Sequence, residues 1–246
     1  VQPSLTSSFA YATIGRGKVW QRELCNRAKD GSEYWVATTI VPMLDEHGKP
    51  ERYIALRTET TQLHTVSKRM RALAYRDPLT GLANRTAVLE RLNECADRRV
   101  ADYSAFVTVA LEDLGVLNDA FGYSEGDRLL LNTAERLLGM QPRPAEVARI
   151  DNSVFALLFE GLGADPTEAE AQAMILAEQV VYEVGTTIRL DLGFSLEPAV
   201  RVGFALCGGG ERLRGAEVYQ RAEIARRRVS MSRGTHRPSK FEPEMV

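Results

Sequence analysis

Apolar and polar residues alternate between Lys18 and Glu59, and the apolar positions are rich in aromatic and β-branched side chains. An alternation with period two is typical of strands that bury one face. Asp30-Gly31 and Glu46-His47-Gly48 interrupt the alternation with residues that favour tight turns. The pattern predicts an antiparallel meander of three strands.

The period becomes helical after the meander. Apolar residues spaced by three, four and three positions form one stripe: Leu63, Val66, Met70 and Leu73. The spacing predicts a short helix, and two interpretations of its stripe are open. The stripe pairs with a second copy of the chain, or it packs on its own domain. Fewer than two heptads are present, whereas a coiled coil usually needs about three or four.

Helical and strand patterns alternate after Asp77. The predicted order is helix 86–96, strand 105–111, helix 124–139, a hairpin of 147–150 and 153–159, helix 167–184, strands 188–192 and 200–206, and helix 216–229. Asp165 is placed to cap the long Ala-rich helix, and Gly185 to end it. Strands interleaved with helices predict an α/β (α+β) fold, with a central sheet covered by helices.

Composition narrows the class of protein. The 246 residues carry a formal net charge of −2 and a pI of about 6.0, so the chain lacks the basic character that nucleic acid attracts. No apolar run is long enough to span a bilayer. Cys25, Cys95 and Cys207 lack the spacing of disulfides or metal ligands, so we expect reduced thiols in a cytoplasmic protein.

Two motifs after the predicted linker helix resemble those of a known family. Asp77-Pro78-Leu79-Thr80-Gly81-Leu82-Ala83-Asn84-Arg85 is followed by Asn118-Asp119-Ala120-Phe121-Gly122-Tyr123-Ser124-Glu125-Gly126-Asp127. Their order and spacing resemble the landmarks of the GGDEF (diguanylate cyclase) family, whose fold agrees with the predicted sheet. In that family a hairpin reads Gly-Gly-Asp/Glu-Glu-Phe, whereas this chain has Asp151-Asn152-Ser153-Val154-Phe155 and matches only Phe155. The resemblance therefore implies a degenerate GGDEF domain.

The resemblance also implies that the catalytic carboxylates are absent. The family's metal-binding aspartate falls at Ala110, its other acidic ligand at Ser153, and a carboxylate needed for catalysis at Val154. Magnesium usually takes one or two carboxylates together with substrate phosphates. We therefore expect no metal site and no binding of Mg²⁺ in the usual way. Glu112 is the one acid matched nearby, and it either approaches a triphosphate through a metal or is solvated at the strand end.

The guanine-contacting positions of the family are retained at Asn118 and Asp127. A carboxylate that accepts hydrogen bonds from adjacent guanine donors, beside a carboxamide, suits the edge of that base. The two residues bracket a glycine-containing turn, which lets them converge on one pocket. The resemblance implies GTP as a ligand. A structural role is the alternative, in which Asp127 complements the following helix and Asn118 stabilises the turn.

Asp151 and Asn152 stand where the family hairpin has its glycines. Both residue types tolerate left-handed backbone conformations, so we expect a tight turn to form without glycine. The replacement removes the close approach of backbone to phosphate that glycine permits.

Both ends of the chain resemble other modules of bacterial signalling. The meander, with Asn26-Arg27-Ala28-Lys29-Asp30-Gly31 and Tyr34-Trp35, resembles the C-terminal half of a PAS sensor domain, and we expect no helix in front of it. Lys240-Phe241-Glu242-Pro243-Glu244-Met245-Val246 resembles the junction that leads into an EAL-type phosphodiesterase domain. The expected organisation is residues 1–61 for the PAS part, 62–76 for the linker helix, 77–239 for the degenerate GGDEF domain and 240–246 for the next linker.

These features lead to one functional expectation and two alternatives. We expect a catalytically inactive GGDEF module that binds GTP and controls an adjacent EAL phosphodiesterase in bacterial cyclic-di-GMP signalling. The alternatives are a residual diguanylate cyclase and a nucleotide-free dimerisation scaffold. A homodimer is expected through the PAS part and the linker helix, while the PAS ligand and the direction of regulation stay open.

Overall fold

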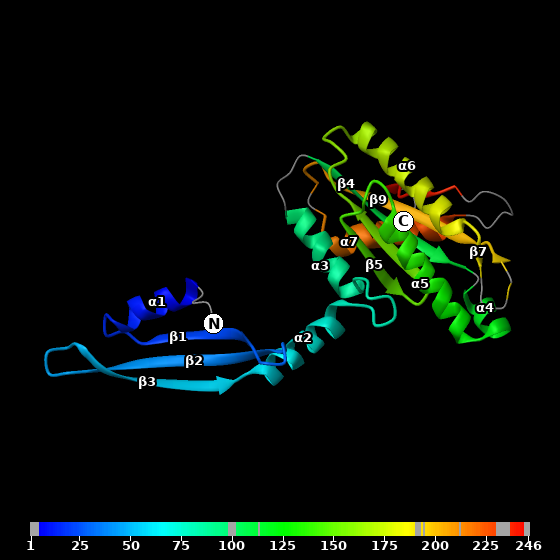
Figure 1. The fold of residues 1–246 in the computed structure, drawn as a ribbon. Helices are drawn as coiled ribbons and strands as arrows, with labels where there is room; N and C mark the ends of the chain where they lie inside the picture. The colour runs from blue at the N-terminus through cyan, green and yellow to red at the C-terminus, as the bar shows by residue number, and fades with distance from the viewer. Residues whose placement is uncertain are drawn as a thin grey trace. The chain divides into compact units, whose positions relative to one another are not determined.

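The chain folds into two compact units. The computed structural model describes residues 5–97, 102–112, 114–189, 193, 195–211, 213–229 and 237–243. One unit comprises Val1–Ala72 and the other Leu73–Val246. The chain passes from the first to the second through helix α2 (Thr61–Tyr75) (Figure 1). Each unit has its own sheet and its own hydrophobic cluster, so each buries a separate core.

The first unit contains the predicted antiparallel meander. Its strands are β1 (Trp20–Arg27), β2 (Glu33–Leu44) and β3 (Pro50–Glu59), hydrogen bonded in that order. The first turn is closed by Asp30, whose carboxylate accepts hydrogen bonds from the backbone N–H and the hydroxyl group of Ser32. The prediction of three strands from the alternating pattern is confirmed.

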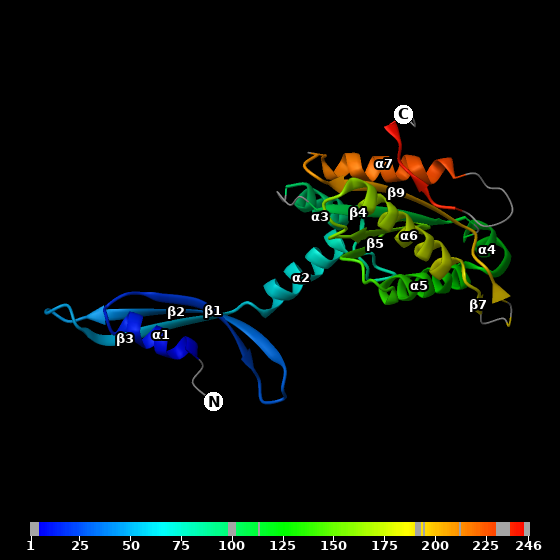
Figure 2. The ribbon, with the colours of Figure 1, turned by 90° about the horizontal axis from the view of Figure 1, so that it is seen from above.

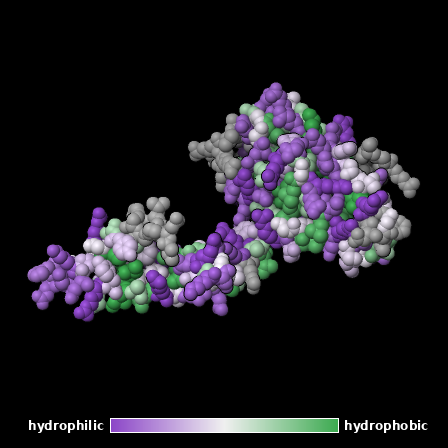
Figure 3. Space-filling model, viewed as in Figure 1, coloured by the Kyte–Doolittle hydropathy of each residue, from purple (hydrophilic) through white to green (hydrophobic). Residues whose placement is uncertain are grey.

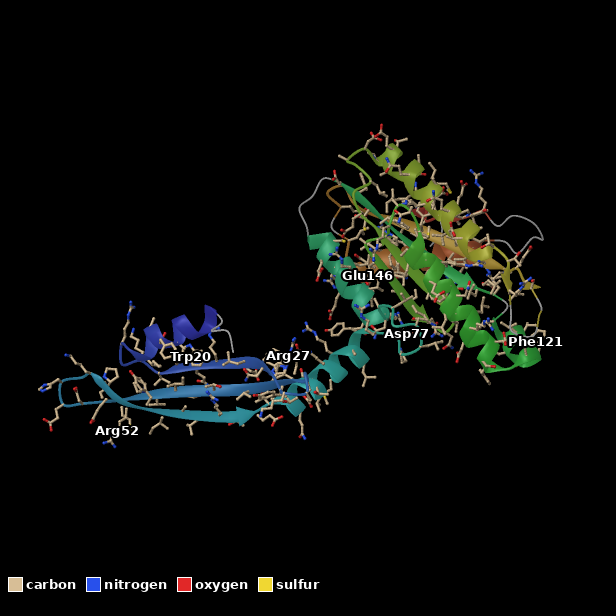
Figure 4. The ribbon with its side chains drawn as sticks, viewed as in Figure 1. Trp20, Arg27, Arg52, Asp77, Phe121 and Glu146 are labelled. Carbon is tan, nitrogen blue, oxygen red and sulfur yellow. The ribbon has the colours of Figure 1, made fainter. Side chains whose placement is uncertain are left out.

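A helix precedes this sheet, so the expectation that none does is wrong. Helix α1 spans Leu5–Ile14, and its residues Ala10 and Ile14 are buried together with Trp20 from β1 (Figure 4). The segment is only weakly amphipathic and contains several Ser and Thr residues. Its sequence therefore shows little helical pattern, and packing against Trp20 stabilises the helix.

Helix α2 forms where the apolar stripe predicts it. Its first turn is attached to the meander, because the Thr61 hydroxyl accepts a hydrogen bond from the Trp35 backbone at 3.0 Å and the His64 ring stacks on Trp35. The stripe residues are exposed by 48% to 73%: Leu63, Val66, Met70 and Leu73. The stripe is uncovered in the single chain, so the interpretation in which it packs on its own domain is wrong.

The second unit is a five-stranded sheet with helices on both faces. The strand order is β10 (Ser239–Lys240), β9 (Val200–Gly208), β4 (Tyr103–Leu111), β6 (Val154–Phe159) and β5 (Glu146–Asp151). Neighbouring strands are antiparallel, except that β10 runs parallel to β9. The predicted α/β (α+β) class, a central sheet covered by helices, is confirmed (Figure 2).

Strand β4 lies at the centre of this sheet and separates two layers. Val107 and Val109 face the cluster under α5 (Tyr123–Gly139) and α6 (Pro166–Gly185). Phe106 and Ala110 face the other cluster, under the remaining two large helices, α3 (Arg85–Asp97) and α7 (Gly215–Arg228). Successive side chains of a strand point to opposite faces. The side chain of Ala110 therefore belongs to the α3 and α7 side.

The long helix α6 is capped as predicted. The Asp165 carboxylate accepts hydrogen bonds from the backbones of Thr167 and Glu168, both at 2.9 Å, and Gly185 is the last helical residue. Helix α4 (Leu114–Phe121) is a difference from the sequence prediction. Its eight residues are too few to show a clear helical period.

Two segments near the end of the chain differ from the predicted pattern. The strand expected over 188–192 is described only as β7 (Ile188–Arg189), paired with β8 (Ser195–Leu196); residues 190–192 lie outside the described residues. Lys240 of the expected EAL junction belongs to β10, and the next residue, Phe241, packs on the second cluster with Arg221 over its ring. The first residues of the junction motif therefore extend the sheet, and residues 244–246 lie outside the described part.

The three cysteines are unpaired: Cys25 is exposed, Cys95 is half-buried and Cys207 is buried. Burial raises the pKa of Cys95 to about 12 and that of Cys207 to about 11, so both thiols stay protonated at neutral pH. These two residues therefore fill space in the core and are poor nucleophiles.

Hydrophilic side chains cover most of the visible face of each unit, with smaller hydrophobic patches between them (Figure 3). Among the helices that the structure describes, none combines the length and the apolar character that crossing a membrane requires.

Candidate functional site

The hairpin of β5 and β6 turns at Asn152 and Ser153, and Asp151 is paired with Val154 across its end. The Asp151 carboxylate accepts a hydrogen bond from the Asn152 backbone at 2.8 Å. The expected tight turn therefore forms without glycine, and it needs no left-handed residue, because within the described chain only glycines have a positive φ. A register irregularity between Arg149 and Asp151 supplies extra local twist at the turn.

Arg149 connects this turn to the loop that follows α2. Its guanidinium Nη1 lies 3.2 Å from Oδ1 and 3.3 Å from Oδ2 of Asp77. Its Nη2 and Nε donate to the Asn152 carbonyl oxygen at 2.7 and 3.2 Å. Only 13% of the Arg149 side chain and 15% of the Asp77 side chain are exposed. The first landmark motif and the hairpin turn therefore form one connected structure.

The loop itself is held by Asp77. Oδ1 of Asp77 accepts hydrogen bonds from the Thr80 backbone at 2.8 Å and from the Thr80 hydroxyl at 2.7 Å. Burial raises the pKa of Asp77, but the hydrogen bonds from Thr80 and the charge of Arg149 outweigh it, so the pKa lies below its usual value. A charged Asp77 is therefore the state that stabilises the loop.

The positions at which the family has its metal ligands and its catalytic carboxylate do not fit a magnesium ion in this chain. Ala110 and Val154 are paired across β4 and β6, are 3% and 8% exposed, and belong to one hydrophobic cluster. Ser153 lies in the turn, and its carbonyl oxygen accepts a hydrogen bond from the Leu111 backbone. Methyl and isopropyl groups cannot coordinate a cation, and a hydroxyl is one neutral oxygen. Over the described ranges, no group of three or more His, Cys, Asp or Glu side chains is arranged to hold a metal.

A charged pair lies at the same end of β4. The Glu112 carboxylate accepts a hydrogen bond from Nη2 of Arg201 at 2.5 Å, and only 18% of the Glu112 side chain is exposed. Glu112 is therefore paired with Arg201 and is not a solvated strand end, whereas its contact to a triphosphate through a metal stays a prediction. Arg201 lies directly across the ladder from Ala110, which is paired on its other side with Val154. Side chains of such pairs share one face of the sheet, so Arg201 emerges beside the two apolar residues.

Asn118 and Asp127 lie on consecutive helices. Asn118 is in the last turn of α4, which ends at Phe121 (Figure 4), and Asp127 is in the second turn of α5. Gly122, with a φ of 89°, joins the helices, so the expected glycine is present but Asn118 is helical. The Asn118 carboxamide lies against Gly126, where any Cβ would overlap its oxygen. The structure therefore places Asn118 beside the residue that precedes Asp127.

Two buried oxygen atoms at this junction have no hydrogen-bond partner among the described residues: Oδ1 of Asn118 and Oε2 of Glu125. Glu125 lies in the first turn of α5 and is 7% exposed, whereas Asp127 is exposed. Leaving a buried polar atom unpaired costs about 1–3 kcal/mol, so such atoms call for an explanation such as a ligand or water. All three groups can accept hydrogen bonds, which suits a ligand that donates them.

Three residues of this region were not assigned a role from the sequence: Arg149, Arg201 and Gly126. Arg201 does carry a signal, because it is the one charged residue in the apolar run from Val200 to Leu206. Arg149 has a similar signal within the predicted strand 147–150, where it is the one charged residue. Gly126 has none, since its importance comes from the close approach of the Asn118 side chain.

Comparison with known proteins identifies the family. The model of the diguanylate cyclase GGDEF domain matches residues 74–233, which is more than half of the chain. The chain belongs to the GGDEF family. The model of the PAS fold matches residues 3–57, so the PAS–GGDEF organisation expected from the motifs is confirmed.

Two relatives are each matched over only part of their length. An uncharacterized protein in the hutH 5′ region of Streptomyces griseus is 41% identical over 100 residues, covering 39% of this chain and 42% of that protein. MucR of Pseudomonas aeruginosa, a bifunctional diguanylate cyclase/cyclic di-GMP phosphodiesterase, is 28% identical over 156 residues, covering 63% of this chain and 22% of MucR. The chain thus spans less than half the length of either relative, and its domain is one found in cyclic-di-GMP signalling proteins.

A solved structure supports the fold. The GGDEF domain of TpbB from Pseudomonas aeruginosa matches with a TM-score of 0.60 and 24% identity, covering 70% of this chain and 96% of that one. At this identity the likeness concerns the arrangement of the sheet and helices.

Replacing Asp77 by Asn tests the connection between loop and hairpin. We expect Asp77→Asn to lower the free energy of unfolding at pH 7 by about 1–3 kcal/mol, because Arg149 loses its charged partner. The native pKa of Asp77 is depressed, so its stabilisation is present above the unfolded pKa of about 3.9 and is lost as the pH falls through the native pKa. Urea unfolding should therefore show a smaller difference between wild type and variant at low pH. Replacing an exposed residue, Glu135→Gln, is the control. If Asp77→Asn lowered the free energy of unfolding equally at every pH, the charge of Asp77 would have no role in stability.

Proposed function

We propose that this GGDEF domain binds a guanine nucleotide without converting it, and that the bound state regulates a neighbouring domain. The observation that carries the proposal is the Asn118 carboxamide, whose buried oxygen has no partner and lies in a space kept open by Gly126. Guanine presents adjacent N1 and N2 donors. The carboxylate of Asp127, with the acceptors of Asn118 and Glu125 at the same junction, suits such an edge.

The absence of turnover is proposed on chemical grounds. Phosphoryl transfer depends on positioning and on stabilising negative charge that is spread over the phosphate oxygens. The family positions for acidic groups are Ala110, Ser153 and Val154 here, and none of them can bind Mg²⁺ as a carboxylate or act as a catalytic acid. Binding without chemistry is therefore the function that these residues support best.

The regulated neighbour in this proposal is an EAL-type cyclic-di-GMP phosphodiesterase domain. Two observations support it: the junction motif that begins at Lys240, and the name of MucR, which combines a cyclase with a phosphodiesterase. The full-length protein would then be the enzyme, and this part would be its regulator. We place the module in the cytoplasm because its three cysteines are unpaired.

Two alternatives are kept for the test. A residual diguanylate cyclase would need a cation and a catalytic acid from other residues. A nucleotide-free scaffold is favoured by one feature, the exposed stripe of α2, and we propose that this stripe also pairs two copies of the chain as a homodimer.

Incubation with GTP and Mg²⁺ or Mn²⁺ tests turnover. We expect no cyclic-di-GMP, because the carboxylate positions at Ala110, Ser153 and Val154 cannot bind the metal or supply an acid. Product would be measured by chromatography against a sample without protein and one with an active cyclase. Product above the protein-free sample would support the residual cyclase.

Replacing Asp127 tests base recognition. We expect Asp127→Ala to weaken GTP binding by roughly tenfold to a hundredfold, because the guanine donors lose a charged acceptor. The same change should leave ATP binding unchanged. Isothermal titration calorimetry with both nucleotides would measure the change. The exposed Asp119→Ala, on the neighbouring helix, is the matched control. Equal losses for GTP and ATP would mean that Asp127 is structural, and no heat from wild type would favour the scaffold.

A charge in the α2 stripe tests the homodimer. Pairing would remove exposed apolar area from water at about 25 cal/mol per Å². We expect Met70→Glu to shift the protein toward monomer in analytical ultracentrifugation, because two like charges would face each other, with circular dichroism unchanged. Lys68→Glu, on an exposed polar position of the same helix, should leave the assembly as it is. A Met70→Glu protein as oligomeric as wild type would show that the contact lies elsewhere.

A further inference from the structure

A charged residue of β9, Arg201, lies beside a metal-ligand position of the family. Ala110, where the family holds its metal ligand, is paired in the ladder with Val154 on one side and Arg201 on the other. The three side chains share one face of the sheet. A guanidinium thus projects beside a position at which the family holds its metal ion, and the residues next to it there, Ala110 and Val154, are apolar.

The charge of this guanidinium is held in place. Its Nη2 pairs with Glu112, and the Glu112 backbone is fixed by its hydrogen bond to the Ala199 carbonyl oxygen at 2.9 Å. Side chains of Glu112 and Arg201 are 18% and 26% exposed, so the pair is shielded yet reachable. Glu112 alone would repel a polyphosphate, and Arg201 offsets that charge.

Arg201 has donor capacity that its partner does not use. A guanidinium carries five N–H donors, and Nε of Arg201 is buried without a hydrogen-bond partner among the described residues. A second arginine on this side, the buried Arg226, differs because Glu223 accepts hydrogen bonds from its Nε and Nη2 at 3.0 and 2.8 Å. Arg201 is therefore the cation that can still bind a ligand.

We propose that Arg201 takes the place of the divalent metal and binds the phosphates of a polyphosphate ligand directly. Guanidinium forks bind phosphate oxygens through paired, charge-assisted hydrogen bonds and need no metal to do so. Binding at this site is then independent of Mg²⁺. That the base of this ligand is guanine rests on the proposed function. That its phosphates bind here is argued from Arg201 and Glu112 alone.

The two partners of the ion pair give opposite predictions. Binding of inorganic triphosphate and of GTP would be measured by calorimetry on the whole chain, once in EDTA and once in Mg²⁺. Wild type should bind both ligands in EDTA. Arg201→Met should weaken both by about tenfold or more, because a charge-assisted contact is lost. Glu112→Gln should tighten both by about fivefold, because a like charge is removed and Nη2 is released.

Controls separate this result from a structural effect. Arg143→Met removes an exposed arginine that precedes β5, at the end of the sheet away from the hairpin turn, and should change neither affinity. If Arg201→Met does not fold, Arg201→Lys serves instead and should show a smaller loss, because it keeps the charge without the fork. Weakening by both Arg201→Met and Glu112→Gln would mean that the pair is only structural and would overturn the inference.

The remaining outcomes distinguish the inference from the proposed function. Triphosphate binding in EDTA without any preference for GTP over ATP would sustain the role of Arg201 and reject guanine recognition. Binding of guanosine with no gain from the phosphates, or binding only in Mg²⁺, would sustain base recognition and reject the role of Arg201. No binding of either ligand would reject both.

Discussion

The ion pair between Asp77 and Arg149 is the contact on which the geometry of the second unit depends. Asp77 holds the loop after α2 through Thr80, and Arg149 holds the hairpin turn through the Asn152 carbonyl oxygen. The pair is shielded from water, so removing one partner would leave a charge without compensation. The position of the turn, and with it the end of β4 where Arg201 and Glu112 lie, is therefore tied to the segment that leaves α2.

The proposed site combines the family's two guanine-contacting positions with altered electrostatics. At the α4–α5 junction, a glycine leaves room for a carboxamide whose oxygen is buried and unpaired, which costs stability unless a ligand or water completes it. At the end of β4, apolar Ala110 and Val154 occupy one metal-ligand position and the catalytic-carboxylate position of the family, and the guanidinium of Arg201 faces the same side of the sheet. The proposed binding of a nucleotide whose phosphates lie on Arg201 without Mg²⁺ accounts for both features.

Much of this fold could be predicted from the sequence, because period-two strands and amphipathic helices bury one face and show it in their pattern. The meander, α2, the central sheet and the Asp165 cap follow such signals. Helix α1 could not be predicted, since its stability comes from packing against Trp20, and α4 is too short to show a period. The tight turn at Asp151-Asn152 follows from residue type, but the register irregularity beside it is invisible in the sequence. Likewise Asn118 and Asp127 came from motif spacing, whereas the pairing of Arg201 with Glu112 depends on strand register.

The central claim is that a guanine nucleotide occupies this domain with its phosphates on a protein cation and no metal. A crystal structure of the chain grown with GTP and Mn²⁺, with diffraction data collected at a wavelength where manganese scatters anomalously, measures this directly. We predict guanine at Asn118 and Asp127, phosphates on Arg201, and no anomalous peak at the phosphates. A manganese peak beside Glu112 and Ala110, or a base bound away from the α4–α5 junction, would contradict the account.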